Sequence, residues 1–412
     1  MDKKKLYLIL ILGLLSAIGP LSIDMYLPAF PDIAKGLHTS VSSVMLSLSS
    51  FFIGISVGQL IYGPLLERFG RKKPLYFGLV LYALSSLACA IALTVDTLII
   101  FRLFQALGGC VGMVAARAMV RDLFELKDNA KVFSTLMLVV AVSPIIAPTL
   151  GGYITLLFGW RYIFGALVVV IVLIIGGIYF LLPESKQPDS NFSLRPKAIL
   201  KGYSTVIKNS QFAIYTFTSA VAYSGLYAYI SGSPYVFMVL FKVSENYYSW
   251  IFATIAIGLI GSSQFNTFIL RWFSSEKIIQ WALLIQNIVA VVLLAITLLG
   301  WVNLYSTIIL VFFFMCCQGF LFPNATALSM APFSSNAGSA SALMGFIQMS
   351  IGAFMSAMVS FLQNETALPM IGIMAFCSLF ASVLFYFGRK KIKKQASATL
   401  VKEEEIEMIS TL

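Results

Sequence analysis

Long apolar runs recur along almost the whole of this 412-residue chain, and they limit its fold more than any other feature. A helix needs about 20 mostly apolar residues to cross the hydrocarbon core of a bilayer. Only 11% of the residues are charged, whereas a soluble domain carries roughly 25%, so an ordinary water-facing surface is excluded. The runs lie near residues 6–28, 41–65, 75–95, 97–119, 131–157, 161–182, 211–232, 248–270, 278–300, 304–328, 338–361 and 368–388. The sequence therefore predicts an all-α membrane protein with twelve transmembrane helices.

Basic residues gather at the edges of the apolar runs, where they set the orientation of membrane helices. The net charge of +11 is by itself also typical of nucleic-acid binding. Its placement argues against a nucleic-acid partner, because Lys3–Lys5, Arg68–Lys73 and Arg389–Lys394 all flank predicted spans. An even number of spans puts both termini on one side, and basic segments at both ends make that side the cytoplasm. We expect a multi-pass protein of a bacterial inner membrane, in contact with the lipid bilayer.

The first apolar run resembles a signal peptide, since Lys3–Lys5 precede the apolar stretch Leu6–Gly19. No small-residue cleavage site follows, and the apolar segment continues past Pro20 to Pro28. We therefore predict a retained first span rather than a cleaved signal.

One long polar segment, residues 184–210, separates the sixth run from the seventh. Its prolines and its mixture of charged and polar residues are typical of a linker. Six spans before it and six after it are the arrangement of a transporter built from two repeated bundles. We expect a bundle over residues 1–183, a cytoplasmic linker over 184–210, a second bundle over 211–388 and a cytoplasmic tail over 389–412, in a monomer. The run Glu403–Glu405 indicates that the tail is disordered.

Asp24 is the only one of 17 acidic residues that falls inside a predicted span. A charged group near the membrane centre costs about 2.5–3.5 kcal/mol on insertion scales, and such groups usually face a cavity and have a function. Pro20 and Pro28 flank Asp24, and their missing backbone donors make the helix easy to bend. Asp24 is therefore the candidate proton carrier.

Arg102, in the fourth predicted span, is the expected partner of Asp24. Each residue lies about four to five residues inside the outer end of its span, roughly 6–8 Å below the boundary at about 1.5 Å per residue. A positive charge on Arg102 close to Asp24 would change how readily Asp24 binds a proton, and would thereby tune proton coupling. Two other interpretations stay open: the pair could merely brace the fold, or Arg102 could snorkel towards the outer interface.

Groups for enzymatic chemistry are missing from the sequence. No Gly-rich loop ending in Lys-Ser/Thr is present to hold nucleotide phosphates. The single histidine, His38, falls in the first outer loop, so a hydrolase triad has no base in the membrane. The five cysteines lie inside apolar runs with no metal-binding spacing. We expect no enzyme activity, no cofactor and no metal, with a gradient as the energy source.

The loop after the second span has an ordered pattern, Gly-Pro-Leu-Leu-Glu-Arg-Phe-Gly-Arg-Lys-Lys over residues 63–73. Gly70 permits a tight turn, and the basic residues suit a cytoplasmic surface with anionic lipids. The pattern resembles the signature loop of the major facilitator superfamily, with Glu67 in place of the usual Asp. The resemblance implies a charge-relay latch on the cytoplasmic side, formed by Gly63, Glu67, Arg68, Gly70, Arg71 and Lys72.

Further stretches resemble the bicyclomycin/chloramphenicol-resistance (Bcr/CflA) subfamily of drug–proton antiporters. They are Asp24–Pro31, Arg102–Gln105 with Gly108, Ala116–Ala118, Arg121–Asp122, Tyr229–Tyr235, Gly319–Ala325 and Ala337–Ala342. The fifth span carries Pro144, Pro148, Gly151 and Gly152, which is similar to the antiporter motif, although Ser143 stands where Gly usually precedes the first Pro. The resemblance runs from the first span through the eleventh. It implies two six-helix bundles and the export of drugs in exchange for protons.

Polar and aromatic residues within the spans are candidates for a substrate cavity. Tyr223 and Tyr227 share one helix face at i and i+4, and aromatic rings with polar tips suit amphipathic drugs. The full set is Tyr26, Gln105, Tyr223, Tyr227, Asn324 and Gln348. Tyrosines also occur in interfacial belts, and a lone Asn or Gln also bonds between helices. Two further pairs indicate close helix packing: Gly54 with Gly58, and Gly108 with Gly112.

Taken together, these features predict a secondary transporter that exports small amphipathic compounds in exchange for protons. Asp24 carries the proton, and Arg102 and Gln105 tune its cavity. Two alternatives stay open: a carrier of a neutral polar metabolite such as a sugar or peptide, and a membrane sensor that moves nothing. The sensor alternative differs from both carrier alternatives because it predicts that no flux of any compound depends on Asp24.

Overall fold

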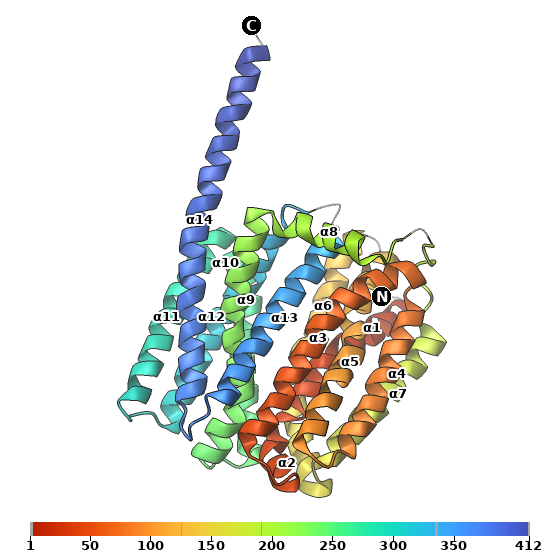
Figure 1. Cartoon of the computed structure of the whole chain (residues 1–412), viewed down its shortest axis with the longest axis vertical. Helices are drawn as coiled ribbons and strands as arrows, with labels where there is room; N and C mark the ends of the chain where they lie inside the picture. The colour runs from red at the N-terminus through yellow and green to blue at the C-terminus, as the bar shows by residue number, and fades with distance from the viewer. Residues whose placement is uncertain (1–2, 125, 191, 334–336, 411–412) are drawn as a thin grey trace.

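The computed structural model describes residues 3–124, 126–190, 192–333 and 337–410, and every regular element in these ranges is helical. Long helices pack side by side in one array (Figure 1). In chain order they are α1 (Lys3–Asp24), η1 (Leu27–Ala29), α2 (Phe30–Gly36), α3 (Val41–Phe69), α4 (Lys72–Ala90), α5 (Val95–Leu123), α6 (Leu126–Phe158), α7 (Arg161–Leu181), α8 (Pro196–Ile207), α9 (Ser210–Pro234), η2 (Tyr235–Leu240), α10 (Glu245–Ile269), α11 (Ser275–Leu298), α12 (Leu304–Met330), α13 (Ala337–Phe361) and α14 (Leu368–Ser410). The predicted all-α class is confirmed.

Eleven of the described helices are long and apolar enough to cross a membrane. They coincide with eleven of the predicted spans. The other predicted span corresponds to α9, which has 25 residues and is rich in Ser, Thr and Tyr. Within α9 only Phe217 is exposed. Because other helices rather than lipid cover α9, its polar side chains do not meet the bilayer.

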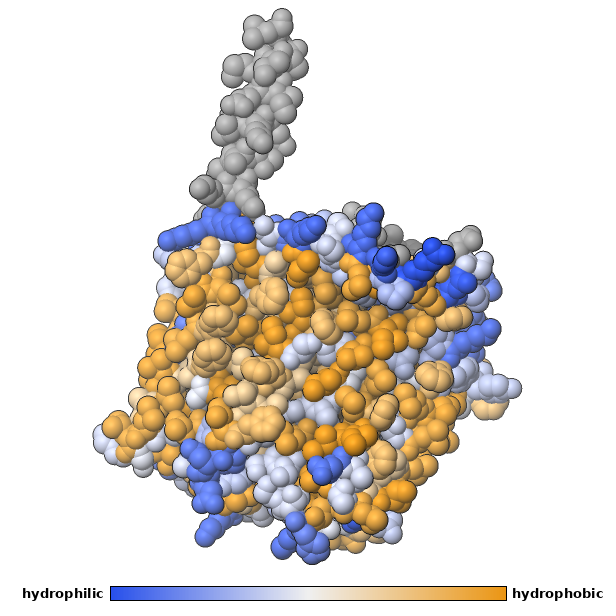
Figure 2. Space-filling view, viewed as in Figure 1, coloured by the Kyte–Doolittle hydropathy of each residue, from blue (hydrophilic) through white to orange (hydrophobic). Residues whose placement is uncertain are grey.

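The surface of the molecule is apolar over a broad belt. Figure 2 shows this belt, with hydrophilic residues gathered above and below it. Phe77, Leu173 and Trp250 are among its side chains, and each is more than 60% exposed. A soluble monomer rarely exposes such an extended apolar surface, whereas lipid tails cover it without cost. The chain is therefore a multi-pass membrane protein.

Small residues bring the helices of the first half into close contact. A Cβ atom on Gly54 of α3 would lie 2.4 Å from the carbonyl oxygen of Leu103 in α5. A Cβ atom on Gly112 of α5 would lie 2.5 Å from the carbonyl oxygen of Leu15 in α1. Any larger side chain would push these backbones apart, so the predicted packing role of these glycines is confirmed.

Two helix pairs join the helices before residue 183 to those after residue 210: α3 packs on α13, and α6 packs on α10. In the first seam the hydroxyl oxygens of Ser49 and Ser356 lie 2.8 Å apart. In the second, the hydroxyl of Ser249 donates to the carbonyl oxygen of Pro148 at 3.1 Å. The seams contain neutral, short side chains, which let the two sets of helices meet closely.

The linker and the tail contain more helix than the sequence predicted. Part of the predicted linker forms α8, and Val206 of α8 is buried against Phe212 and Ala340. The tail, expected to be disordered, continues α14 as helix to Ser410 and projects away from the array (Figure 1). The tail is rich in Lys, Glu and Ala, and these strong helix formers extend a helix that has already begun.

Candidate functional site

Asp24 is the last residue of α1 and is only 4% exposed. The chain then turns at Met25 and Tyr26 before the short helices η1 and α2. Pro28 lies within the first turn of η1, where its missing N–H costs no hydrogen bond. The helical break predicted around Asp24 therefore exists, and it leaves a carboxyl group enclosed at a helix end.

Helix α6 packs directly on the turn that follows Asp24. A Cβ atom on Gly151 would lie 2.0 Å from the carbonyl oxygen of Met25, so only glycine fits there. Gly152 has more room, since its nearest neighbour would be the hydroxyl of Ser249 at 3.5 Å. The predicted antiporter-motif helix thus touches the Asp24 turn through Gly151, while Pro148 bonds to α10.

The Asp24 carboxyl group has no hydrogen bond or ion pair with any residue that the structure describes. It lies within electrostatic range of Tyr229 in α9 and Tyr248 in α10. The hydroxyl of Tyr248 lies 2.9 Å from that of Ser233. Asp24 is therefore close to helices of the second half. Tyr229 and Ser233 fall in the stretch Tyr229–Tyr235, which could have drawn attention to them from the sequence; Tyr248 had no such signal.

The expected pairing of Arg102 with Asp24 is wrong. The Arg102 side chain is fully buried and donates to Gln105 Oε1 at 2.7 Å and to the carbonyl oxygen of Ser22 at 3.2 Å. Its guanidinium carbon lies 4.4 Å from the ring centre of Tyr26 and 4.1 Å from that of Phe51. Sequence spacing predicted how far below the outer membrane boundary Asp24 and Arg102 lie. It could not predict on which side of its helix each residue lies. Arg102 neither braces Asp24 nor snorkels outward.

Tyr26, Arg102 and Gln105 come together in one buried network of the first half. Gln105 Nε2 donates to the hydroxyl of Ser86 in α4 at 2.7 Å. The hydroxyl of Tyr26 lies 2.7 Å from that of Ser47 in α3. Arg102 Nε is buried without a hydrogen-bond partner among the described residues, but the other contacts tie α4 and α3 to α5 and to the turn after α1.

Tyr223 and Tyr227 form an aromatic cluster with rings from two other helices. Their own ring centres lie 5.7 Å apart. Tyr223 lies 4.3 Å from Phe322 of α12, and Tyr227 lies 4.7 Å from Phe52 of α3. This cluster spans the boundary between the two halves, as a surface for amphipathic molecules would.

Asn324 and Gln348 are engaged in contacts between helices. Asn324 Nδ2 donates to Asn266 Oδ1 of α10 at 2.7 Å. Gln348 Nε2 donates to the hydroxyl of Ser219 in α9 at 3.2 Å. For these two residues the structure supports the interhelical interpretation over a free place in a cavity.

The latch residues meet around the buried side chain of Arg71, which is 3% exposed. Arg71 Nε donates to Asp122 Oδ2 at 2.7 Å, and its NH1 donates to Glu67 Oε1 at 3.0 Å. Desolvation acts to lower the pKa of Arg71, but the hydrogen bonds and charges of Asp122 and Glu67 outweigh it and raise that pKa. The cation therefore stays charged, and it joins α3 to α5.

A third carboxylate, Glu184, reaches the latch from the segment after α7. It accepts from the backbone N–H of Arg71 at 2.7 Å and from that of Lys72 at 3.0 Å. Lys186 forms an ion pair with Glu67, and Arg68 donates to the carbonyl oxygen of Asp189 at 3.3 Å. Sequence reasoning missed Glu184 and Lys186, because loop composition does not show which backbone donors they would reach.

Gly70 turns the latch in a backbone conformation that side chains avoid, with φ 79° and ψ −179°. Gly63, by contrast, lies inside α3, and a Cβ atom there would meet nothing within 4 Å. Gly70 therefore has a conformational role, whereas Gly63 has neither a close neighbour nor a strained backbone.

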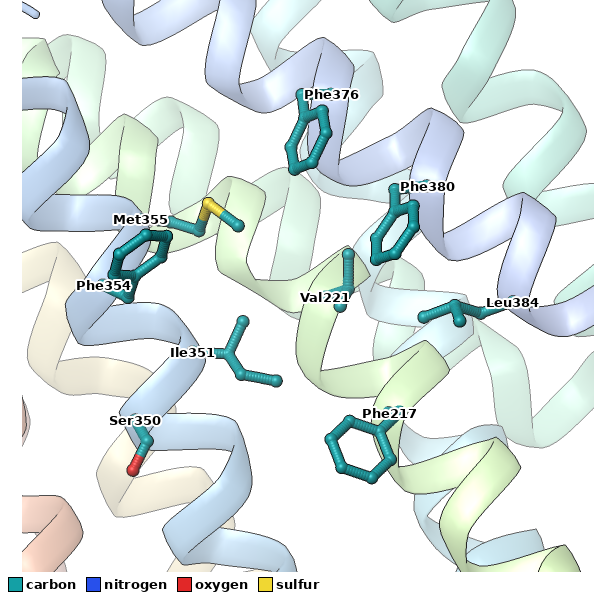
Figure 3. A pocket seen from close by; sticks show the side chains of 9 residues that line it. All are labelled: Phe217, Val221, Ser350, Ile351, Phe354, Met355, Phe376, Phe380 and Leu384. Carbon is teal, nitrogen blue, oxygen red and sulfur yellow. The ribbon is translucent and has the colours of Figure 1, made fainter.

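An apolar groove of about 490 Å³ lies between α9, α13 and α14 (Figure 3). Phe217, Phe354, Phe376 and Phe380 are among its lining residues, and all four are exposed on the apolar surface. No predicted site residue lines this groove. Among the described residues, no group of three or more His, Cys, Asp or Glu side chains is placed to hold a metal ion.

Comparison with known sequences gives matches over nearly the whole chain. Residues 12–357 match the Major Facilitator Superfamily. An uncharacterized MFS-type transporter of Bacillus subtilis (strain 168) is 35% identical over 390 residues, covering 93% of this chain and 96% of the relative. The bicyclomycin resistance protein homolog of Haemophilus influenzae is 30% identical over 386 residues, covering 94% and 97%. Multidrug resistance protein D of Escherichia coli (strain K12) is 28% identical over 380 residues, covering 90% and 93%.

A solved structure supports the fold. The D-xylose-proton symporter superposes with a TM-score of 0.72 at 15% identity, covering 93% of this chain and 98% of that one. At this identity the likeness concerns the fold alone. The sequence matches carry the assignment further: this chain belongs to the major facilitator superfamily, within the Bcr/CflA subfamily, and it is a transporter rather than an enzyme.

Proposed function

We propose that this protein exports small amphipathic compounds from a bacterial cell in exchange for protons. In this proposal α9 is the twelfth span, and two six-helix bundles, residues 1–183 and 211–388, move against each other about the seams α3–α13 and α6–α10. The linker 184–210, the tail 389–412 and both termini are cytoplasmic. The protein works as a monomer in the inner membrane.

The enclosed Asp24 carboxyl group is the observation that carries the proposal. A buried ionisable group without a partner is costly, and inside a membrane it usually has a function. A neutral carboxyl group is less costly to enclose away from water than a carboxylate. Loading a proton onto Asp24 therefore favours the closed arrangement, and releasing it favours an arrangement in which water reaches the site.

The position of Asp24 supports coupling between proton and substrate. Asp24 lies at the end of α1, within electrostatic range of Tyr229 and Tyr248 of the second half. A substrate that enters between the halves changes the same contacts, so proton and substrate affinities become linked. Gly151 transmits movement of α6 to this turn, since nothing separates α6 from Met25.

Two further features support an amphipathic substrate. The rings of Tyr223, Tyr227, Phe52 and Phe322 supply an apolar surface with two hydroxyl groups. Relatives bear the names bicyclomycin resistance protein homolog, chloramphenicol resistance protein and multidrug resistance protein. We transfer to this chain the general class, small antibiotic-like compounds, and no single compound.

The test is efflux of a candidate drug from proteoliposomes under an imposed pH gradient. We expect Asp24→Asn, which mimics the protonated group at nearly equal size, to abolish gradient-driven flux while substrate exchange at equal pH persists. Asp96→Asn is the matched control, because Asp96 is exposed in the first turn of α5, and its flux should equal that of the wild type. Equal gradient-driven flux in Asp24→Asn and wild type would remove Asp24 from the mechanism.

A further inference from the structure

Gln59 of α3 is a buried amide side chain that belongs to neither the latch nor the surroundings of Asp24. The residue is only 4% exposed, and its amide group has no hydrogen bond with any residue that the structure describes. An amide group enclosed in this way loses its hydrogen bonds to water and gains none in return, which costs free energy. A native structure keeps such a group only where something offsets that cost.

The amide group of Gln59 lies directly against α13, at Gly345. A Cβ atom on Gly345 would overlap Gln59 Oε1, so the amide occupies the space that a side chain at position 345 would need. The glycine thus leaves a notch in α13, and the Gln59 side chain fills it. At this point the two halves of the molecule interlock by shape, without a hydrogen bond from the amide.

Other polar side chains of the α3–α13 seam do have partners. Ser56, three residues before Gln59, donates to the carbonyl oxygen of Phe346 at 3.1 Å, and its hydroxyl lies 2.7 Å from that of Ser350. Ser49, one further turn-pair along the same face, bonds to Ser356. These serines hold the closed seam together, whereas the unpartnered amide of Gln59 opposes closure.

Gln59 lies towards the latch end of this seam. It stands ten residues before the end of α3 at Phe69, about 15 Å along the axis at 1.5 Å per residue. The next residue, Leu60, accepts from the hydroxyl of Tyr203 in α8 at 3.4 Å. Helix α8 also packs on α13, so the linker helix holds the same end of the seam closed. Separation of α3 from α13 at the latch end would bring water to Gln59.

We propose that Gln59 opposes closure of the latch end of the α3–α13 seam and thereby sets the balance between a closed and an open arrangement of the two halves. The inference rests on the proposed export function, of which it explains one conformational step. When the seam opens, water supplies the hydrogen bonds that the closed seam denies to the amide. The latch, α8 and the serine pairs favour closure. A carrier needs both arrangements to be populated, so an opposing contribution of this kind has a use.

The test measures the distance between the two halves in the full-length protein, in nanodiscs of phosphatidylcholine, without substrate or gradient. Nitroxide labels are attached through p-acetylphenylalanine in place of Lys73 and Ser274, which are exposed and lie in different halves. The five native cysteines then stay in place. Double electron–electron resonance gives the populations with a short and a long distance between labels, and hence the ratio of open to closed protein.

Gln59→Leu removes the unpartnered amide at similar size, and an apolar side chain gains by burial. We expect the ratio of open to closed protein to fall about tenfold. Gln264→Leu is the matched control, because Gln264 is exposed on α10, and its ratio should equal that of the wild type. Gly345→Ala should raise the ratio, since the added methyl group displaces the amide from its notch. Gly345→Ala combined with Gln59→Ala should lose that rise, because the shortened side chain leaves the notch free.

An unchanged or higher ratio in Gln59→Leu, with a thermal unfolding midpoint no lower than that of the wild type, would overturn the inference. So would an equal fall in Gln264→Leu. If Gln59→Leu does not fold, or the wild type shows no measurable open population, Gly345→Ala decides: a rise that Gln59→Ala reverses supports the inference, and any other result overturns it. The expected ratios in a protein without gradient-driven flux would overturn the proposed export and keep this inference. Normal flux with ratios that do not depend on Gln59 would do the reverse.

Discussion

Two corners of the molecule can be compared directly, because each joins the second and third long helix of its half. The corner between α3 and α4 turns at Gly70 and encloses Arg71 among carboxylates. The corner between α10 and α11, residues 270–274, contains no residue with positive φ. Its nearby ion pair joins Glu276 of α11 to Arg389 of α14, and both side chains are about one-quarter to one-third exposed. Corresponding corners thus have different chemistry.

The difference extends from the corners into the centres of the two halves. In the first half, Asp24 and Arg102 place ionisable side chains among the helices, and both are buried. In the second half, α9, α12 and α13 contain no charged residue, and neutral pairs such as Asn324 with Asn266 join helices instead. We infer that the first half handles charge and that the second half provides neutral contacts.

The largest effect is expected where α6 meets the Asp24 turn. Gly151→Ala puts a methyl group 2.0 Å from a backbone oxygen, so the turn has to move. We expect a loss of about 3 kcal/mol of stability and at least a tenfold loss of gradient-driven flux. Gly152→Ala, with 3.5 Å of room, should match the wild type. Unfolding midpoints in detergent and proteoliposome flux are the measurements, and equal behaviour of the two variants would show that this contact does not matter.

The turn of the first corner comes next. Gly70→Val forces a branched side chain into a glycine conformation, at a cost of about 2 kcal/mol, and its Cβ atom would meet the carbonyl oxygen of Lys186 at 3.1 Å. We expect the protein to reach the membrane and the transport cycle to stop. Gly63→Ala, in open space inside α3, is the control and should transport normally. Wild-type flux from membrane-inserted Gly70→Val would contradict the latch.

A pair of charge-removing variants tests the two corners against each other. Asp122→Asn weakens the hydrogen bonds of the buried Arg71 and should cost about 1.5 kcal/mol. Glu276→Gln breaks a partly exposed pair and should cost about 0.5 kcal/mol or less. Unfolding in increasing denaturant measures both. Equal costs would mean that the two corners are energetically alike.

The smallest effect is expected from the neutral contacts of the second half. Asn324→Ala removes one hydrogen bond between α12 and α10, which in a membrane protein is worth about 0.6 kcal/mol. Export should continue at close to the wild-type rate. Complete loss of flux from a stable Asn324→Ala protein would place essential polar chemistry in the second half. That result would contradict the difference inferred between the two halves.

Much of the fold followed from local sequence. Every predicted span falls on a long helix, because apolar runs of membrane length have few other stable structures. The exceptions are instructive. Helix α9 is long enough to cross a membrane but is not among the helices that are apolar enough to do so. Other helices rather than lipid cover it. The tail was expected to be disordered on account of its acidic run, yet its Lys, Glu and Ala residues continue α14.

For the site, the sequence by itself determined which residue types occur and at what depth. It singled out Asp24 by its position in an apolar run, and the Gly70 turn by its pattern. Only the tertiary structure decided partners. Arg102 lies against the rings of Tyr26 and Phe51, and Asp24 lies within electrostatic range of Tyr229 and Tyr248, some two hundred residues away in the chain. The physical reason is that hydrophobic length sets how far along a helix a residue lies, whereas the direction in which it faces its neighbours depends on how the helices pack.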